Sequence, residues 1–162
     1  MTAHIFQLNL SNGGVPKTAV RTAEVSNLGI AGDRQRDLEH HGGPQRALCL
    51  YSLDQILALQ AEGHPIYPGA IGENITIAGL DWVQVVPGAR LQLGREVKIE
   101  ITSYAIPCRN IQHSFIESKY GRVSPKTNPG WARAYAKVLQ TGLVTVGDAV
   151  TLEKAVDGPP NS

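Results

Sequence analysis

Turn-forming residues divide this chain into short segments. It contains 17 glycines and 10 prolines among 162 residues, about 17% where an average protein has roughly 12%. Between them, apolar side chains mostly alternate with polar ones, which is the period of a half-buried β-strand. Charged residues make up only 18% of the chain, below the usual quarter. These features predict many short strands and exclude a coiled coil or a charged helical array.

The alternating and apolar runs predict strands along the whole chain, and helices at only two or three places. The predicted strands cover residues 5–10, 18–25, 46–51, 83–86, 91–93, 97–102, 143–146 and 149–152. Ser52 and Gln55 form an S-x-x-Q capping box that predicts a helix ending before Gly63. A second helix is predicted from Asn110 to Tyr120, and residues 131–138 fit either a third helical turn or a strand. The expected fold is mostly β and β-barrel-like, with two or three short helices.

Length and charge limit the classes of function. A chain of 162 residues has room for one domain, which we expect to cover residues 1–154, with a flexible polar tail at 155–162. The net charge of +1 argues against a broad surface for nucleic acid or membrane. No apolar run is long enough to span a bilayer, and the two cysteines form no C-x-x-C pair. We therefore expect a cytoplasmic protein with reduced thiols.

Cys108 is the first candidate for chemistry. It follows Pro107 and precedes the second predicted helix, whose N-terminus would favour a thiolate together with the neighbouring Arg109. A thiolate is a nucleophile and a soft metal ligand. The alternative is a buried, inert thiol, which is the commonest state of a free cysteine. Cys49 lies within the apolar run 46–51, where we expect only a packing role.

Two glycine-rich segments could approach a ligand closely. Residues 40–46 read HHGGPQR, so glycine N–H groups and the Arg46 guanidinium could bind an anion. His40 and His41 do not suit one metal ion, because adjacent side chains of an extended chain point in opposite directions. The alternative is a glycine turn with exposed histidines.

The second glycine-rich segment, residues 68–76, reads PGAIGENIT. Glu73, Asn74 and Thr76 supply hydrogen-bond donors and acceptors next to glycines. An ordinary hairpin loop uses the same residues, so the segment alone is weak evidence for a site. Gly32 and Asp33 read as a type I turn.

Together these segments resemble the MOSC domain family, named after the C-terminal domain of molybdenum cofactor sulfurase. The resemblance rests on the order of GDRQRD, HHGG with RALCLYS, PGAIGENIT, GARLQLG, and a PC pair before a helix. It extends from about residue 32 to residue 152. The sequence is most similar to the small stand-alone bacterial type.

The resemblance implies a β-barrel-like fold with its ordered loops at one mouth, and a molybdenum cofactor (molybdopterin) in the pocket. Cys108 would handle sulfur or coordinate the molybdenum. The residues implied to hold the cofactor are His41, Gly42, Gly43, Arg46, Gly72, Glu73, Asn74 and Thr76. Relatives often carry a basic residue three before the cysteine and a lysine two after it. Here these positions are Ala105 and Asn110, so Arg109 would supply the charge.

The resemblance leaves several functions open. One class is an oxidoreductase that reduces N-hydroxylated compounds, with electrons from a partner protein because the chain has no flavin, haem or iron–sulfur motif. The same class includes a sulfur-transfer domain in which Cys108 carries sulfur from a donor protein. A cysteine hydrolase would use His41 or His113 as the base. A non-catalytic cofactor chaperone or interaction module is a further alternative.

Overall fold

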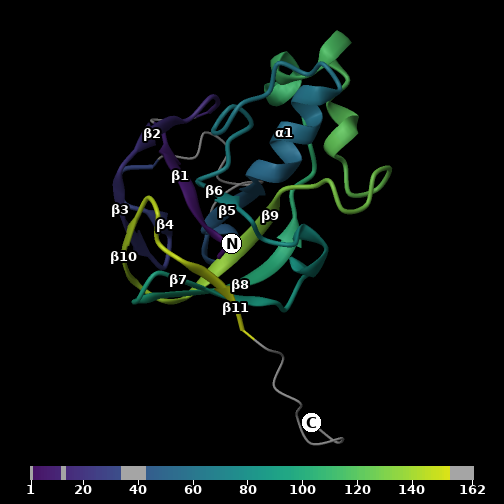
Figure 1. Ribbon diagram of the computed structural model, residues 1–162. Coiled ribbons are helices and arrows are strands. Elements are labelled where there is room, and N and C mark those ends of the chain that lie inside the picture. Colours follow the sequence, from purple (N-terminus) through teal and green to yellow (C-terminus); the bar gives the residue numbers. More distant parts are fainter. Residues whose placement is uncertain (1, 12–13, 34–42, 154–162) are drawn as a thin grey trace, which may run out of the picture.

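The computed structural model describes residues 2–11, 14–33 and 43–153, and within them the chain is mostly β-strand (Figure 1). The predicted tail at 155–162 lies outside the described residues. The strands, in chain order, are β1 (His4–Leu10), β2 (Thr18–Val20), β3 (Thr22–Ser26), β4 (Gly29–Ile30), β5 (Leu48–Ser52), β6 (Ile75–Ala78), β7 (Arg90–Leu93), β8 (Val97–Tyr104), β9 (Ala134–Gln140), β10 (Gly142–Thr145) and β11 (Val150–Leu152).

The strands form two sheets. The larger has the order β11-β7-β8-β9-β5-β6-β1-β2, and the smaller has the order β10-β3-β4. All neighbours are antiparallel except β5 and β6. Two consecutive parallel strands need a crossover connection, and the helix α1 (Leu53–Ala61) lies in that connection.

The larger sheet curls until its first strand returns toward its last. His4 on β1 forms a bridge with Ala149, directly before β11. The backbone N–H of Ile5 also donates to the carbonyl of Asp148, at 2.9 Å. Among the described residues the strand ladder does not continue around to a closed barrel. The mostly β fold with few short helices is thus confirmed, and the barrel-like form is a curled, open sheet.

Alternation and continuous apolar runs position the core. Along β8, Val97, Ile99 and Ile101 are buried while the intervening side chains are half-exposed. In β5 and β6 every residue is buried, because these central strands have strands on both sides and are covered on both faces. The apolar run that starts at Ala47 is therefore a central strand.

Helix α1 begins where the sequence predicts. The Ser52 hydroxyl accepts a hydrogen bond from the backbone N–H of Gln55, at 3.2 Å. The Gln55 side chain does not return to Ser52 and instead donates to the carbonyl of Gly130, at 2.9 Å. Only half of the predicted capping box is therefore formed. No helix within the described part of the chain is long and apolar enough to cross a membrane.

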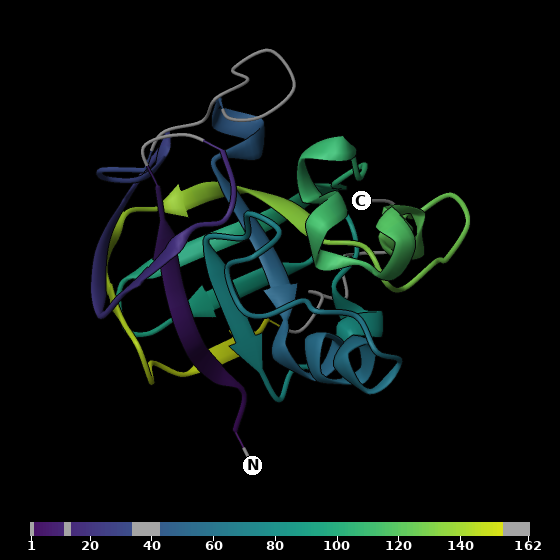
Figure 2. The ribbon, with the colours of Figure 1, turned by 90° about the horizontal axis from the view of Figure 1, so that it is seen from above.

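The predicted helix at 110–120 is wrong. The chain forms three short 3₁₀ segments instead, at Arg109–Ser114, Ile116–Ser118 and Tyr120–Val123. Phe115 is extended between the first two. This conformation brings its ring 5.3 Å from that of His64 and lets the N–H of Ile116 donate to His64 Nδ1 at 3.1 Å. Tertiary contacts with His64, just after α1, therefore override the helical periodicity. Figures 1 and 2 show these segments on the same side of the strands as α1.

The structure also decides two other predicted segments, residues 83–86 and residues 131–138. The predicted strand at 83–86 is wrong, because Trp82–Gln84 form a 3₁₀ turn capped by the carboxylate of Asp81, which accepts from the N–H of Val83 at 3.2 Å. Residues 131–138, which fit a helix or a strand, contribute to strand β9. The other predicted strands correspond to observed strands, and Arg21 separates the run 18–25 into β2 and β3.

The half-formed capping box gives a test of what starts α1. Replacing Ser52 by alanine should lower the free energy of unfolding by about 1 kcal/mol, because the N–H of Gln55 loses its acceptor. Gln55→Ala should lower it by less than about 0.5 kcal/mol, because an exposed contact is lost. Urea titrations of both variants measure the difference. Equal losses would show that the contact with Gly130 matters as much as the cap.

Candidate functional site

The two free cysteines lie in different environments. Cys108 is half-exposed and lies after β8, at the start of the 3₁₀ segment Arg109–Ser114. Cys49 lies on β5 with 6% of its surface exposed. Burial raises the pKa of the Cys49 thiol to about 11, so this thiol stays protonated at neutral pH. Cys108 is therefore the thiol that solvent and a ligand can reach.

The helix expected to activate Cys108 is not an α-helix. A 3₁₀ segment of six residues follows the cysteine, and the N–H of Ile111 donates to the Cys108 carbonyl at 3.2 Å. The expectation that a helix macrodipole favours a thiolate at Cys108 is therefore wrong, since a macrodipole needs an aligned α-helix. Arg109 is exposed.

Tyr135 connects the surroundings of the two thiols. It lies on β9 opposite Cys49 and packs with Cys49 and Ala105 in a small buried cluster. The guanidinium carbon of Arg46 lies 5.5 Å from the centre of its ring. Burial raises the pKa of Tyr135, and negative charge on Cys49 or Cys108 would raise it further. Ala105 lies three positions before Cys108, so the Arg46–Tyr135 contact lies next to the segment that leads to Cys108.

Residues 72–76, called the GEN segment after Gly72, Glu73 and Asn74, form a buried network of hydrogen bonds. Glu73, Asn74 and Thr76 are fully buried, and Gly72 is half-buried. The Asn74 carboxamide accepts from the N–H of Cys49 at 2.9 Å, and the N–H of Asn74 donates to the carbonyl of Cys49 at 2.7 Å. Asn74 therefore fixes this segment to the strand that carries Cys49.

A second set of hydrogen bonds ties the same segment to β1. The side-chain nitrogen of Asn9 donates to the carbonyl of Glu73 at 3.0 Å and to the Thr76 hydroxyl at 3.3 Å. That hydroxyl donates to Glu73 Oε2 at 3.0 Å. Burial raises the pKa of the Glu73 carboxyl, although Arg133 acts in the opposite direction. Glu73 Oε1 and Arg133 Nε are buried without a hydrogen-bond partner within the described residues.

Asp33 completes the network with a buried ion pair. Its carboxylate lies 2.6 Å from Lys17 Nζ, and both side chains are 4% exposed. It also accepts from Asn74 Nδ2 at 2.8 Å and from the N–H of Ser11 at 2.9 Å. The turn predicted at Gly32 and Asp33 is present, since the N–H of Asp33 donates to the Ile30 carbonyl at 3.1 Å. The sequence did not indicate the ion pair.

Part of the predicted anion site lies outside the described residues. This applies to His40, His41 and Gly42, whose roles stay predictions. Gly43 is described and precedes the 3₁₀ turn Pro44–Arg46. Among the described residues no group of three or more His, Cys, Asp or Glu could hold a metal ion.

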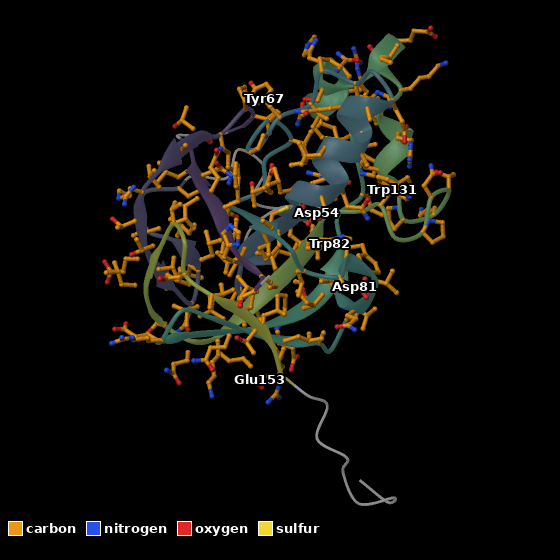
Figure 3. The ribbon with its side chains drawn as sticks, viewed as in Figure 1. Asp54, Tyr67, Asp81, Trp82, Trp131 and Glu153 are labelled. Carbon is orange, nitrogen blue, oxygen red and sulfur yellow. The ribbon has the colours of Figure 1, made fainter. Side chains whose placement is uncertain are left out.

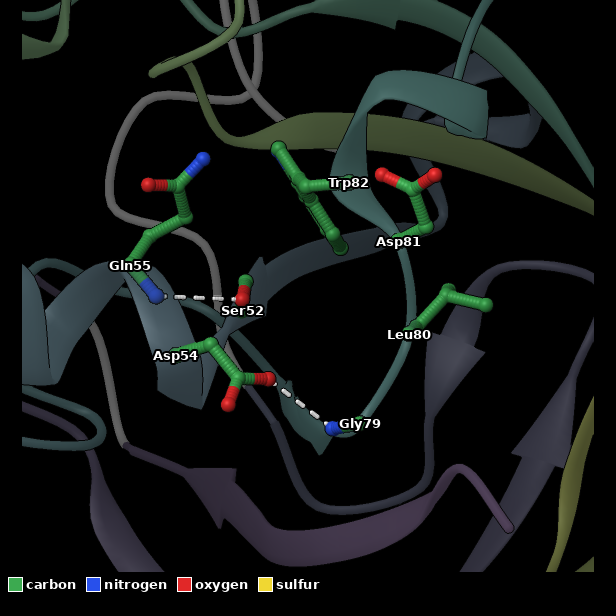
Figure 4. Close-up of a pocket in the computed structure, with 7 residues that line it drawn as sticks. All are labelled: Ser52, Asp54, Gln55, Gly79, Leu80, Asp81 and Trp82. Carbon is green, nitrogen blue, oxygen red and sulfur yellow. Dashed lines mark hydrogen bonds between the residues drawn. The ribbon is translucent and has the colours of Figure 1, made fainter. Parts of the chain in front are cut away.

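A separate open pocket of about 490 Å³ lies at the start of α1 (Figure 4). Its lining residues come from the start of α1 and from the segment after β6, and are Ser52, Asp54, Gln55, Gly79, Leu80, Asp81 and Trp82. One Asp54 oxygen accepts from the N–H of Gly79 at 2.9 Å. None of the residues predicted to form the site lines this pocket, so it is not part of the candidate site.

The buried ion pair can be tested by removing one partner. Lys17→Met should lower the free energy of unfolding by about 3 kcal/mol, because it leaves the Asp33 carboxylate buried without its cation. Lys98→Met is the matched control, since Lys98 forms an exposed pair with Glu153 at 3.9 Å. It should cost less than about 0.5 kcal/mol. Similar losses in the two urea titrations would contradict a structural role for the buried pair.

The raised pKa of Glu73 predicts a pH-dependent stability. Between the ordinary value of 4.5 and the raised one, the native state holds a proton that the unfolded state has lost. This contribution to stability is full below the ordinary value and is lost as pH rises through the native value. Glu73→Gln should remove this dependence in urea titrations between pH 4.5 and 8. A variant curve parallel to that of the wild type would count against the prediction.

Comparisons with known proteins agree on one family. The MOSC domain family matches residues 37–151, more than two thirds of the chain. The YflK protein of Bacillus subtilis (strain 168) is 31% identical over 139 residues, which are 85% of this chain and 62% of that protein. The YiiM protein of Escherichia coli (strain K12) is 30% identical over 112 residues, which are 66% of this chain and 50% of that protein. The chain therefore spans between half and two thirds of the length of these relatives.

Solved structures share the fold. The crystal structure of YiiM from Geobacillus stearothermophilus has a TM-score of 0.73 at 22% identity, covering 96% of this chain and 77% of that one. The YUAD protein of Bacillus subtilis has a TM-score of 0.73 at 19% identity, covering 93% of this chain and 94% of that one. The sequence match and the shared fold together lead to one conclusion: the chain belongs to the MOSC domain family.

Proposed function

We propose that the protein binds a molybdenum cofactor, with Cys108 as its thiolate ligand and Arg46 at the anionic end of the pterin. The observation that carries the proposal is the contrast between the two thiols. Cys49 is sealed in the sheet, whereas Cys108 is half-exposed. Tyr135, over which Arg46 lies, also packs against Ala105, three residues before Cys108. Membership of the MOSC domain family supports the choice of cofactor.

The donor set suits such a cofactor. A thiolate is a soft ligand of the kind that a metal in a sulfur-rich environment prefers. A guanidinium offers paired N–H donors that match a phosphate. The ring of Tyr135 lies under Arg46 and would keep that side chain directed at the anion. Gly43, at the start of the turn that carries Arg46, would bring backbone N–H groups close to it.

The GEN segment supports the site from beneath in this proposal. Glu73, Asn74 and Thr76 are completely buried and bonded mainly to one another and to β1 and β5. They would hold the strands that carry the site, and Gly72 is the member of this segment with an exposed part. Arg109, which is exposed beside Cys108, would add positive charge.

When bound, the cofactor would supply two-electron oxo transfer. For an N-hydroxylated compound the balance is N–OH plus two electrons and two protons, giving N–H and water. The electrons would come from a donor protein. Cys108 would hold the metal, and Arg46 would orient the pterin.

A sulfur-carrier role is the second candidate, favoured by the same exposed thiol. The Cys108 thiolate would then attack the outer sulfur of a persulfide on a donor protein, so that a new S–S bond forms on Cys108 as the donor's S–S bond breaks and the donor leaves as a thiolate. This step needs no metal. Exposure of the thiol suits both functions, because each requires a second molecule to reach the sulfur atom.

Paired variants test the proposed function. Purified from a host that makes molybdenum cofactor, the wild-type protein should retain molybdenum and pterin. Cys108→Ser should lose molybdenum-dependent activity while pterin still binds, because a protonated hydroxyl is a poor ligand. Arg46→Ala should weaken retention of the whole cofactor by about 1.5–3 kcal/mol, the scale of a charged hydrogen bond. Elemental analysis and pterin fluorescence on the same preparations measure both.

Cys49→Ala is the control for the thiol. It should retain the cofactor and lower stability by about 1–2 kcal/mol. Loss of cofactor with Cys49 and not with Cys108 would place the site at the other thiol. If Cys108→Ser and Arg46→Ala both behave as the wild type, Cys108 and Arg46 do not form a cofactor site.

A further inference from the structure

A second, smaller pocket of about 120 Å³ lies beside the 3₁₀ segment that follows Cys108. Its polar lining residues are Tyr67, Asn110, His113 and Ser114, and the other five are aliphatic or proline. The lining contains no Asp, Glu, Lys or Arg. Figure 3 shows Tyr67 well away from Asp54, Asp81 and Trp82, so this pocket and that of Figure 4 are distinct.

The size of the pocket limits its ligand. A cavity of about 150 Å³ inside a protein can bind benzene, whereas pockets that enclose a complete drug-sized ligand measure about 300–1,000 Å³. A volume of about 120 Å³ is somewhat smaller than that benzene site, so the pocket encloses at most one six-membered ring. The rest of a larger ligand would extend out of the pocket.

The lining also limits the charge of the ligand. Placing an ion in a site without an opposite charge is costly, and none of the lining side chains carries a fixed charge. Hydrogen-bonding groups are nevertheless present. Ser114 is 7% exposed and borders the pocket, and its hydroxyl has no hydrogen bond within the described residues. A ligand with both a donor and an acceptor would use these groups.

The pocket lies close to Cys108 along the chain. Asn110 lies two positions after Cys108, so their Cα atoms are at most about 7.6 Å apart. Ile111, another lining residue, donates its N–H to the Cys108 carbonyl at 3.2 Å. A ligand whose ring occupies the pocket therefore lies close to the backbone of Cys108.

We propose that this pocket binds the uncharged, single-ring part of a substrate and so selects which compounds reach Cys108. The binding of the ring stands on the pocket alone. Its use as a substrate subsite rests on the proposed function of Cys108. The substrate class is an uncharged aromatic or heteroaromatic ring that carries a hydrogen-bond donor and an acceptor.

Four related probes test the binding of the ring to protein prepared without cofactor. Benzamide is neutral, benzoate and benzamidinium are charged analogues, and 2-naphthamide has a second ring. We expect benzamide to bind about tenfold more tightly than either ion, with amide NMR shifts at Ala70, Ile111 and Ser114. The larger 2-naphthamide should bind more weakly. Equal binding of benzoate, shifts located elsewhere, or no shifts up to about 20 mM would overturn the proposal.

Variants test whether benzamide binding depends on the residues that line the pocket. Ser114→Ala should weaken benzamide about fivefold, because one hydrogen bond is lost. Ala70→Leu should abolish binding by filling the space. Gln112→Ala is the matched control, since Gln112 lies on the same 3₁₀ segment and does not line the pocket. A Gln112 effect as large as that of Ser114 would overturn the assignment.

A reactive probe tests the distance to Cys108. Bromoacetanilide alkylates a thiol: the Cys108 sulfur forms a bond to the methylene carbon of the probe, the carbon–bromine bond breaks and bromide leaves. The quantity compared is the alkylation rate of bromoacetanilide divided by that of bromoacetamide. If the ring first occupies the pocket, this ratio should be about tenfold higher for Cys108 than for glutathione. Benzamide and Ala70→Leu should each remove the difference. Equal ratios for protein and glutathione would overturn the link to Cys108 and leave the cofactor proposal untouched.

Discussion

The side chain and backbone of Asn74 hold together three parts of the chain that are far apart in sequence. Its carboxamide binds the backbone of Cys49 and the carboxylate of Asp33, and its carbonyl accepts from the N–H of Asn9. Asn74 is fully buried, so any of these groups left unpaired would cost about 1–3 kcal/mol. The loop before β6 is therefore fixed against both β1 and β5, and the strands around the site are fixed with it.

Two basic and two acidic side chains are buried in the network around Asn74. Lys17 pairs with Asp33, while Arg133 lies near Glu73 and lowers the pKa of its carboxyl, against the larger effect of burial. Arg133 also donates to the Ile71 carbonyl at 2.7 Å. The cluster holds the chain in place without facing solvent. Of the two thiols, Cys108 is the one exposed at the surface.

The sequence predicted those elements whose pattern is local. Strand β8 follows from the alternation at 97–102, and α1 follows from the Ser52 cap. The helix at 110–120 failed because the contacts of Phe115 with His64 come from another part of the chain. The sequence motif at residues 68–76 identified Glu73 and Asn74 as candidate site residues. The sequence of a glycine-rich loop does not indicate which of its side chains are buried. Arg133, a lone cation among alanines and aromatic residues (WARAYA), was the signal available for the buried cluster.

The two cysteines show how the fold places identical side chains in different environments. A thiolate at Cys49 would be desolvated, and its repulsion by Glu73 and Asp33 would offset the attraction of Arg133 and Lys17. The same hydrogen bonds that fix Asn74 hold the backbone of Cys49 inside the sheet. Cys108 follows the end of β8, directly before a 3₁₀ segment, and is half-exposed. Tyr135 packs against Cys49, and Arg46 lies over its ring, so the buried thiol helps to position the ring that holds this cation.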